Sequence, residues 1–180
     1  MYGIIHNSLK QLVKEKGGES AWLEITRAAK TQENFIDDRQ YQDSETLGLI
    51  EAACKYLEMD LEECLEVFGE HWITRTADEV HGFLMNMTGA TFLEFMKNVN
   101  GLHDRLSTAY PGYMAPVFKT LIENQDITVV YKSHRKGLAP LVRGMLKGLA
   151  ARFGEKIIIK KEEDRSTDSY QETVFFLELS

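Results

Sequence analysis

Cysteine and proline are scarce in this 180-residue sequence, which contains two cysteines and three prolines. Cys54 and Cys64 are too few for a disulfide framework, and neither stands in a C-x-x-C pair, so we expect reduced, buried thiols and not zinc ligands. No run approaches the roughly 18 apolar residues that a membrane-spanning helix needs. The N-terminus lacks the basic start, apolar core and cleavage site of a signal peptide. We therefore expect a cytoplasmic protein without a membrane partner.

Dense clusters of basic residues are also missing. The formal net charge is −7, and the Lys and Arg residues are scattered except for a short group at 132–136. A nucleic-acid-binding surface needs such residues gathered on one face, so the sequence does not favour nucleic acid as a partner. A glycine-rich phosphate loop, a kinase signature and a cyclase motif are missing too, which predicts a protein that is not an enzyme.

The sequence does contain ample material for a globular core. It is 43% hydrophobic and 27% charged, with nine Phe, seven Tyr and seven Met, enough bulky and adaptable side chains to wrap a flat apolar ligand. A chain of this length forms one domain, here residues 1–180, or two subdomains that share a core. We expect a soft boundary between subdomains near residues 60–70.

Helical periodicity dominates the first part of the chain. Apolar residues three and four apart predict a first helix that ends at Gly17-Gly18 and a second that starts near Ser20. Asp43 or Ser44 is the expected N-cap of a third helix, and Asp60 is the expected N-cap of a fourth. The inward positions predicted for the third and fourth helices are Leu47, Ile50, Ala53, Tyr56, Leu57, Leu61, Cys64, Leu65 and Phe68.

The segment that starts at Thr91 has the most regular helical spacing, and residues 72–87 before it are expected to be helical with a break. Asn100-Gly101 is a poor helix interior and predicts a kink near the end of the Thr91 helix. Tyr110-Pro111-Gly112 should end this helix and begin a loop that runs to Pro116. The apolar stripe of the Thr91 helix consists of Phe92, Phe95, Met96, Val99, Leu102 and Leu106.

The character of the sequence changes after this loop. Residues 127–131, 156–160 and 172–179 are rich in β-branched and aromatic residues and predict strands. Residues 138–149 between the first two have helical spacing. Helices first and strands later predict an α+β protein with a helical N-terminal subdomain and a C-terminal subdomain that holds an antiparallel sheet plus helices.

One of the five histidines lies on a long apolar stripe. His103 follows Val99 by four residues and Met96 by seven, so it lies on or beside the buried face of its helix. A lone histidine there is by default a core or boundary residue. The other four histidines have no partner at metal-ligand spacing, which argues against a structural zinc or a two-histidine catalytic site. These four are His6, His71, His81 and His134.

Tyr131, Ser133 and Arg135 alternate along a predicted strand, so their side chains should share one face. A phenol, a hydroxyl and a guanidinium on one face form a good cradle for a carboxylate or phosphate, since Arg provides a bidentate charge-assisted bond. The alternative is the exposed polar face of an edge strand. Taken alone, three alternating residues favour that simpler interpretation.

The order and spacing of three segments carry more information than any one of them. L-H-D-R-L at 102–106, Y-P-G at 110–112 followed by Pro116, and Y-x-S-x-R-x-G-L at 131–138 together resemble the H-NOX family. This family comprises haem nitric oxide/oxygen binding proteins and includes the haem domain of soluble guanylate cyclase. The opening M-Y-G-I-I and the length also resemble one whole domain of this family, in the form of a stand-alone bacterial member.

The resemblance implies a haem b cofactor between the two subdomains. It implies that His103 is the proximal ligand of ferrous iron and that Tyr131, Ser133 and Arg135 hydrogen-bond the haem propionates. The chemistry agrees, because imidazole is a good iron ligand and buried carboxylates need donors and positive charge. Pro116 matches a proline whose contact distorts the porphyrin from planarity. The further pocket residues implied by position are Ile5, Leu141 and Met145.

The resemblance also bears on the choice of gas. Members that hold oxygen stably carry a distal tyrosine in the helix after the propionate motif, and the corresponding residues 138–142 have no hydroxyl. Leu9 in the first helix offers no donor either, and Thr74 is the remaining polar candidate. Bound O2 needs a hydrogen bond, whereas NO and CO bind well in an apolar pocket. We therefore expect a five-coordinate ferrous haem that binds NO and CO and discriminates against O2.

The expected function is that of a nitric oxide sensor. NO weakens the bond trans to it, so the iron–His103 bond lengthens or breaks, the turn at Asn100-Gly101 loses its anchor, and the subdomains shift. The output lies in a separate protein, which for stand-alone bacterial members is a histidine kinase or a cyclic-di-GMP enzyme. The alternatives are an O2- or CO-binding haem sensor and a haem-free module that binds a carboxylate or phosphate through Tyr131, Ser133 and Arg135.

Overall fold

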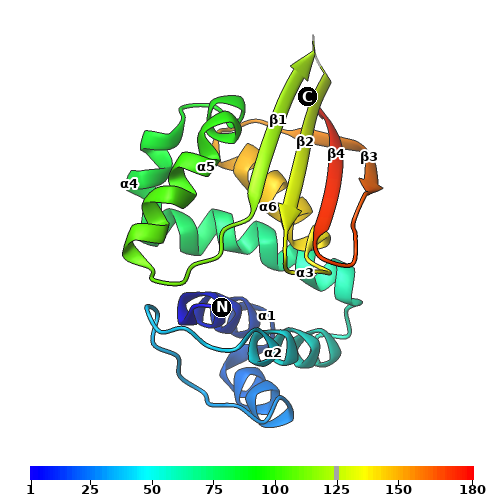
Figure 1. The fold of residues 1–180 in the computed structure, drawn as a ribbon. Coiled ribbons are helices and arrows are strands. Elements are labelled where there is room, and N and C mark those ends of the chain that lie inside the picture. The colour runs from blue at the N-terminus through cyan, green and yellow to red at the C-terminus, as the bar shows by residue number, and fades with distance from the viewer. Residues whose placement is uncertain (124–125) are drawn as a thin grey trace.

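The computed structural model describes residues 1–123 and 126–180, and it consists of a helical part followed by a sheet (Figure 1). This order confirms the predicted α+β class. None of the helices in these ranges combines the length and apolar character that crossing a bilayer requires. The elements are α1 (Gly3–Ala28), α2 (Asp43–Tyr56), α3 (Leu61–His71), the π-helix η1 (Trp72–Ala77), α4 (Asp78–Thr88), α5 (Phe92–Ala109), β1 (Val117–Glu123), β2 (Asp126–Ser133), α6 (Ala139–Arg152), β3 (Ile157–Asp164) and β4 (Gln171–Leu179).

The four strands form an antiparallel sheet in the order β1-β2-β4-β3, with α6 packed behind it (Figure 1). The predicted strands correspond to β2, β3 and β4, which confirms their antiparallel arrangement. β1 was not predicted, because it lies at the edge of the sheet and its residues alternate between exposed and half-buried without a strong apolar face. The edge strand nevertheless matters for the site, since it directly follows Pro116.

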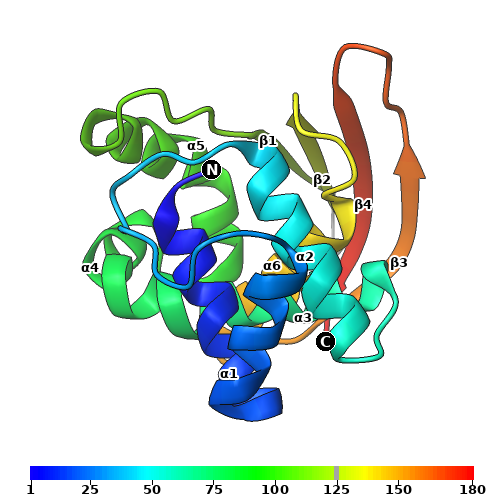
Figure 2. The same ribbon diagram turned by 90° about the horizontal axis from the view of Figure 1, so that it is seen from below.

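The buried apolar side chains form two clusters. One cluster joins α4, α5 and α6 to β2 and β4, and the other joins α1, α2 and α3. Figure 2 shows α1 and α2 on the side of the molecule away from the sheet. α3 lies between the two clusters, since its Phe68 belongs to the α1–α2 cluster while its backbone contacts α6.

Two glycines allow α3 and α6 to pack with their backbones in contact. A Cβ atom added at Gly69 would lie 2.0 Å from the carbonyl oxygen of Leu141, and one added at Gly144 would lie 1.9 Å from that of Glu66. Neither distance is possible for real atoms, so a side chain at either position would push the helices apart. This close approach matters for function because α6 carries Leu141 and Met145 toward a cavity.

The predicted helix limits are confirmed at two places. Gly18 has a φ of 79° and interrupts α1, as expected for the Gly17-Gly18 pair. Residues 72–87 are helical as predicted, but in place of a break they contain the π-helical segment η1, which continues into α4 with helical φ/ψ at Ala77 and Asp78. The side chain of Asp60 accepts a hydrogen bond from the backbone N–H of Glu63 at 2.8 Å and caps α3 as predicted.

Other local predictions are wrong. The N-cap of α2 is Gln42, which makes no capping bond, and Asp43 is engaged elsewhere. The inward face of α2 is rotated from the predicted one, so that Leu47 and Tyr56 are exposed. The predicted face of α3 is correct for Cys64, Leu65 and Phe68, but Leu61 at its first position is exposed. The helical spacing alone fitted more than one face, and only packing against neighbouring helices selects one of them.

The kink predicted at Asn100-Gly101 does not exist, and α5 runs without interruption from Phe92 to Ala109. Asn100 instead joins α5 to the edge strand. Its Nδ2 donates to the carbonyl oxygen of Phe118 at 2.7 Å, and its Oδ1 accepts from the N–H of Phe118 at 3.0 Å. This paired contact holds α5 against β1 one turn before His103.

Candidate functional site

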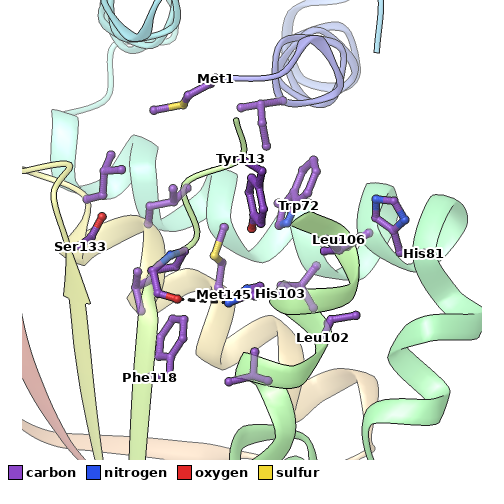
Figure 3. A pocket seen from close by; sticks show the side chains of 18 of the residues that line it. Met1, Trp72, His81, Leu102, His103, Leu106, Tyr113, Phe118, Ser133 and Met145 are labelled. Atoms are coloured by element: carbon purple, nitrogen blue, oxygen red, sulfur yellow. Dashed lines mark hydrogen bonds between the residues drawn. The ribbon is translucent and has the colours of Figure 1, made fainter. Parts of the chain in front are cut away.

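A cavity lies where α1, η1, α5 and α6 meet the loop 110–116. Its volume is about 280 Å³, and its walls are mostly apolar. Figure 3 shows side chains from these elements converging on it. His103 enters the cavity from α5, and Trp72 enters from η1. The cavity therefore lies between the two hydrophobic clusters, where the resemblance places the cofactor.

His103 is held as a neutral imidazole with one nitrogen turned to the cavity. Its Nδ1 lies 3.2 Å from the carbonyl oxygen of Pro116, marked by the dashed line in Figure 3. A carbonyl oxygen only accepts, so Nδ1 carries the proton and Nε2 keeps a free electron pair. Burial lowers the pKa of His103, and the hydrogen bond to Pro116 offsets only part of that effect. Nε2 has no hydrogen-bond partner among the described residues.

Two aromatic rings lie near the imidazole of His103. The ring centroid of Tyr113 lies 6.2 Å from that of His103 at an interplanar angle of 73°, and the centroid of Phe118 lies 6.0 Å away at 42°. Both aromatic residues flank Pro116, which accepts the hydrogen bond. The hydrogen bond from Nδ1 to Pro116 orients the ring and leaves Nε2 for a ligand, as in metal-binding histidines, whose second nitrogen is held by such a bond.

Tyr131 and Ser133 lie on the buried side of β2 and line the cavity, as their alternation predicts. Burial raises the pKa of Tyr131, so its phenol remains a donor. Arg135 also lines the cavity, but it lies beyond the end of the strand, so its place does not follow from alternation. It comes close to Ser133 through a local turn, in which the N–H of Arg135 donates to Oγ of Ser133 at 3.1 Å.

The guanidinium of Arg135 is oriented by partners that the sequence did not reveal. Its Nε donates to Oδ2 of Asp43 at 2.7 Å, and its Nη1 donates to the carbonyl oxygen of Met114 at 3.0 Å. Oδ1 of Asp43 accepts from the α-amino group of Met1 at 2.7 Å. Burial raises the pKa of Asp43, but the hydrogen bonds from the amino terminus and Arg135 outweigh it and hold the pKa below its usual value. Nη2 of Arg135 donates to no protein group within the described ranges.

The structure brings together all the residues that the resemblance assigns to the pocket. Ile5, Leu141, Met145 and Pro116 line the same cavity as His103. The two positions considered for gas selectivity do not line it. Leu9 is buried in the α1–α2 cluster. Thr74 is exposed and donates from Oγ1 to the carbonyl oxygen of Glu70 at 2.9 Å.

These residues fit an iron porphyrin with carboxylate side chains. Among the described residues, no three His, Cys, Asp or Glu side chains gather closely enough to hold a metal ion by themselves. A metal beside His103 therefore has to bring most of its ligands within a cofactor. The apolar walls suit a flat ring system, and the unpaired Nη2 of Arg135 beside Tyr131 and Ser133 suits an anionic edge.

Comparison with known proteins agrees with this geometry. A family model described as Haem-NO-binding matches residues 2–161. Two soluble guanylate cyclases of Caenorhabditis elegans, gcy-33 and gcy-35, are each 25% identical to this chain, over 174 and 173 residues, and each match covers 93% of the chain. The matched region is only 18% of gcy-33 and 25% of gcy-35. The chain thus spans about a quarter or less of the curated relatives it matches.

Solved structures show the same fold. An H-NOX protein from S. oneidensis in the Fe(II)NO ligation state superposes with a TM-score of 0.85 at 21% identity, covering 100% of this chain and 99% of the other. An oxygen-binding H-NOX domain related to soluble guanylate cyclases superposes with a TM-score of 0.84 at 17% identity, covering 100% and 95%. At these identities the likeness establishes the fold and leaves the choice of gas open.

Proposed function

The chain belongs to the haem-NO-binding family, whose H-NOX domains bind haem and diatomic gases, and on this premise we propose that it is a haem b-based nitric oxide sensor with His103 on the iron. CO is a second ligand. Residues 1–180 act as one sensor domain that is not itself an enzyme. It works in the cytoplasm, and its shape regulates a separate signalling protein, a histidine kinase or a cyclic-di-GMP enzyme.

The state of His103 is the observation that carries the proposal. Its proton is held on Nδ1 by Pro116, and Nε2 faces a mostly apolar cavity without a hydrogen-bond partner among the described residues. A polar nitrogen exposed to apolar walls costs free energy unless it finds a partner. Iron bound at Nε2 supplies that partner, and imidazole is the usual proximal ligand in haem sensors and globins.

Tyr131, Ser133 and Arg135 hold the propionates in this proposal. The two hydroxyl groups lie on the buried face of β2, and Arg135 offers Nη2 while Asp43 and Met114 fix the rest of its guanidinium. Charge-assisted bonds from a fixed guanidinium are stronger than those from a mobile one, because less side-chain freedom is lost on binding.

When bound, the haem would supply the iron that takes up the gas, and His103 would be the protein ligand that links this iron to α5. The protein residues turn that event into a shape change. A change in the hold on His103 would act on α5, which contacts the sheet through the paired hydrogen bonds of Asn100 with Phe118. Pro116 is both the acceptor for His103 and a wall of the cavity, so movement of α5 also shifts the loop before β1. We place the transmitted motion in this loop before β1, since α5 itself has no kink.

The test is the electronic spectrum of the reduced protein with and without NO. We expect a Soret band of five-coordinate ferrous haem that shifts on NO binding to the position of five-coordinate nitrosyl haem. His103→Gly should remove iron–histidine ligation, whereas His81→Gly, which replaces another histidine of the same cavity, should preserve it. A colourless protein that takes up no haem would refute the proposal and favour the carboxylate- or phosphate-binding module.

A further inference from the structure

The outward face of α4 carries three large apolar side chains that belong to neither hydrophobic cluster. Val80, Phe83 and Met87 are 52%, 75% and 59% exposed. Steps of three and four residues place them on one stripe of the helix. Among the described residues, no other helix exposes three large apolar side chains. Single exposed apolar residues are ordinary in soluble proteins, whereas an aligned patch of them indicates an interaction site.

The stripe is not needed to hold α4 in place. Met85, which is 2% exposed, and the partly buried Leu84 already pack α4 into the cluster that it shares with α5 and α6. Polar side chains at the three stripe positions would leave this packing unchanged. The fold alone therefore gives no reason for an apolar outward face.

The helix that carries the stripe also forms part of the cavity wall. His81 and Met85 of α4 line the cavity, and His81 is labelled in Figure 3. Both side chains lie on a different face of the helix from Phe83, because Phe83 is exposed to solvent. A displacement of the cavity wall that moves α4 therefore also moves the outward stripe.

The polar surroundings of the stripe are acidic. Asp78 and Glu79 directly precede Val80, and α4 contains no Lys or Arg. Acidic residues in a first turn usually interact with free N–H groups, but η1 continues into α4, and the N–H of Asp78 already donates to the carbonyl oxygen of Arg75. Asp78 pairs with Arg152 at 2.8 Å, whereas Glu79 has no ion-pair partner among the described residues. Since the whole chain carries a net charge of −7, this surface favours a basic partner.

The size of the patch argues against a second copy of this chain as the occupant. A stable interface buries about 800 Å² on each partner, and three side chains on two turns of helix fall well short of that area. A contact between two copies of α4 would also place no positive charge opposite Glu79, because α4 has none. A small apolar stripe with an acidic rim instead matches the size of a transient contact with one helix.

We propose that Val80, Phe83 and Met87, with Glu79 at their rim, form the docking surface for a basic amphipathic helix of a separate signalling protein. The proposal rests on the proposed function, in which a separate protein receives the signal, and deepens it by assigning the surface of contact. The partner helix presents apolar residues three and four positions apart, and Lys or Arg residues opposite Glu79. Phe83 is the anchor, because aromatic side chains contribute most to such contacts.

The test measures binding of a fluorescent peptide made of leucine and lysine, with leucines three and four residues apart, to the reduced, haem-loaded protein by fluorescence anisotropy. We expect Phe83→Ala to weaken binding about tenfold or more. Alanine is the best helix former, so the variant should keep α4 intact. Ile158→Ala is the matched control and should bind like wild type, because Ile158 is 53% exposed on β3, on the opposite side of the molecule from α4 (Figures 1 and 2).

A second pair of variants tests the charge. Glu79→Lys should weaken binding of the lysine peptide about threefold or more. Glu24→Lys makes the same change in net charge at an exposed residue of α1 and should leave binding close to wild type. Equal effects of the two variants would overturn the proposal, because the peptide would then respond only to net charge. A peptide with glutamate in place of lysine should not bind.

The remaining outcomes are equally distinct. Unchanged binding in Phe83→Ala, or no binding to wild type, overturns the proposal. A wild-type dimer in sedimentation that Phe83→Ala converts to a monomer also overturns it, because a second copy would then cover the stripe. The haem spectrum of the same samples is a separate readout. A normal Soret band that shifts with NO, without peptide binding, refutes the docking surface alone, and a protein that takes up no haem refutes the proposed function even if it binds the peptide.

Discussion

Replacing Gly144 with alanine should separate α3 from α6 and thereby open the cavity that holds His103. The added Cβ would lie 1.9 Å from the carbonyl oxygen of Glu66, whereas ordinary van der Waals contact begins at 3.4 Å. The obstacle is backbone and not a flexible side chain tip, so the helices have to move apart by more than 1 Å. The cavity side chains of α6, Leu141 and Met145, move with their helix.

The magnitude can be estimated from packing. A gap of 0.5–1 Å forfeits about a quarter to a half of the dispersion energy of the atoms that face it. Overpacking of a well-ordered core costs about 1–3 kcal/mol, and more where backbone has to move. We therefore expect Gly144→Ala to lower the free energy of unfolding by about 3 kcal/mol. It should also weaken haem retention.

The assay is urea unfolding of the holoprotein, combined with transfer of haem to an excess of apomyoglobin. Gly101→Ala is the matched control, since this glycine also lies inside a helix but a Cβ there meets nothing within 4 Å. Alanine favours the helix over glycine by about 1 kcal/mol, so the control should be more stable than wild type. Equal stability of Gly144→Ala and wild type would refute the claim that backbone contact joins these helices.

Three further predictions concern Asp43, His103 and His6. Asp43→Asn keeps the shape of the side chain but removes its charge. Because Asp43 is partly exposed, we expect the free energy of unfolding to fall by about 1 kcal/mol, and haem loss to become faster because Arg135 becomes mobile. An unchanged rate of haem loss would contradict this prediction. His103→Gly should give the unliganded protein the hydrogen-exchange pattern of α5 and β1 that NO gives the wild type; a pattern like that of unliganded wild type would contradict the release mechanism. His6 is fully buried, which lowers its pKa from 6.5 to about 4. The unfolded state therefore takes up the proton first as pH falls below 6.5, and stability falls between pH 6.5 and 4. His6→Gln should remove about 2 kcal/mol of this pH dependence, measured by urea unfolding at pH 7 and pH 4.5.

Much of the secondary structure could be predicted because it depends on neighbours in the chain. The stripe from Phe92 to Leu102, the cap at Asp60 and the break at Gly18 each follow from residues within a few positions. Asn100-Gly101 shows the limit of this reasoning. Its poor helix propensity predicted a kink, but the two hydrogen bonds of Asn100 with Phe118 hold the helix straight against β1.

The candidate site was predicted from a different kind of information. Spacing alone made His103 a core residue and made Tyr131 and Ser133 one face of a strand. The ordered combination of motifs pointed to the family, which the comparisons establish. The roles of His103, Tyr131, Ser133 and Arg135 stay predictions, although the structure brings all four to one cavity.

The sequence by itself determined which residue types were available and where helices and strands could form. It could not determine which of them meet. Asp43 and Arg135 are separated by 92 positions, and their pairing depends on how α2 lies beside the end of β2. Likewise, the carbonyl group that fixes the proton of His103 belongs to Pro116, and any residue type could have supplied it. The scarcity of clustered basic residues and of cysteine argued against nucleic-acid binding and zinc ligation by cysteine. The chemistry of the cavity depends on contacts that only the tertiary structure forms, because a hydrogen bond requires atoms within about 3 Å of each other.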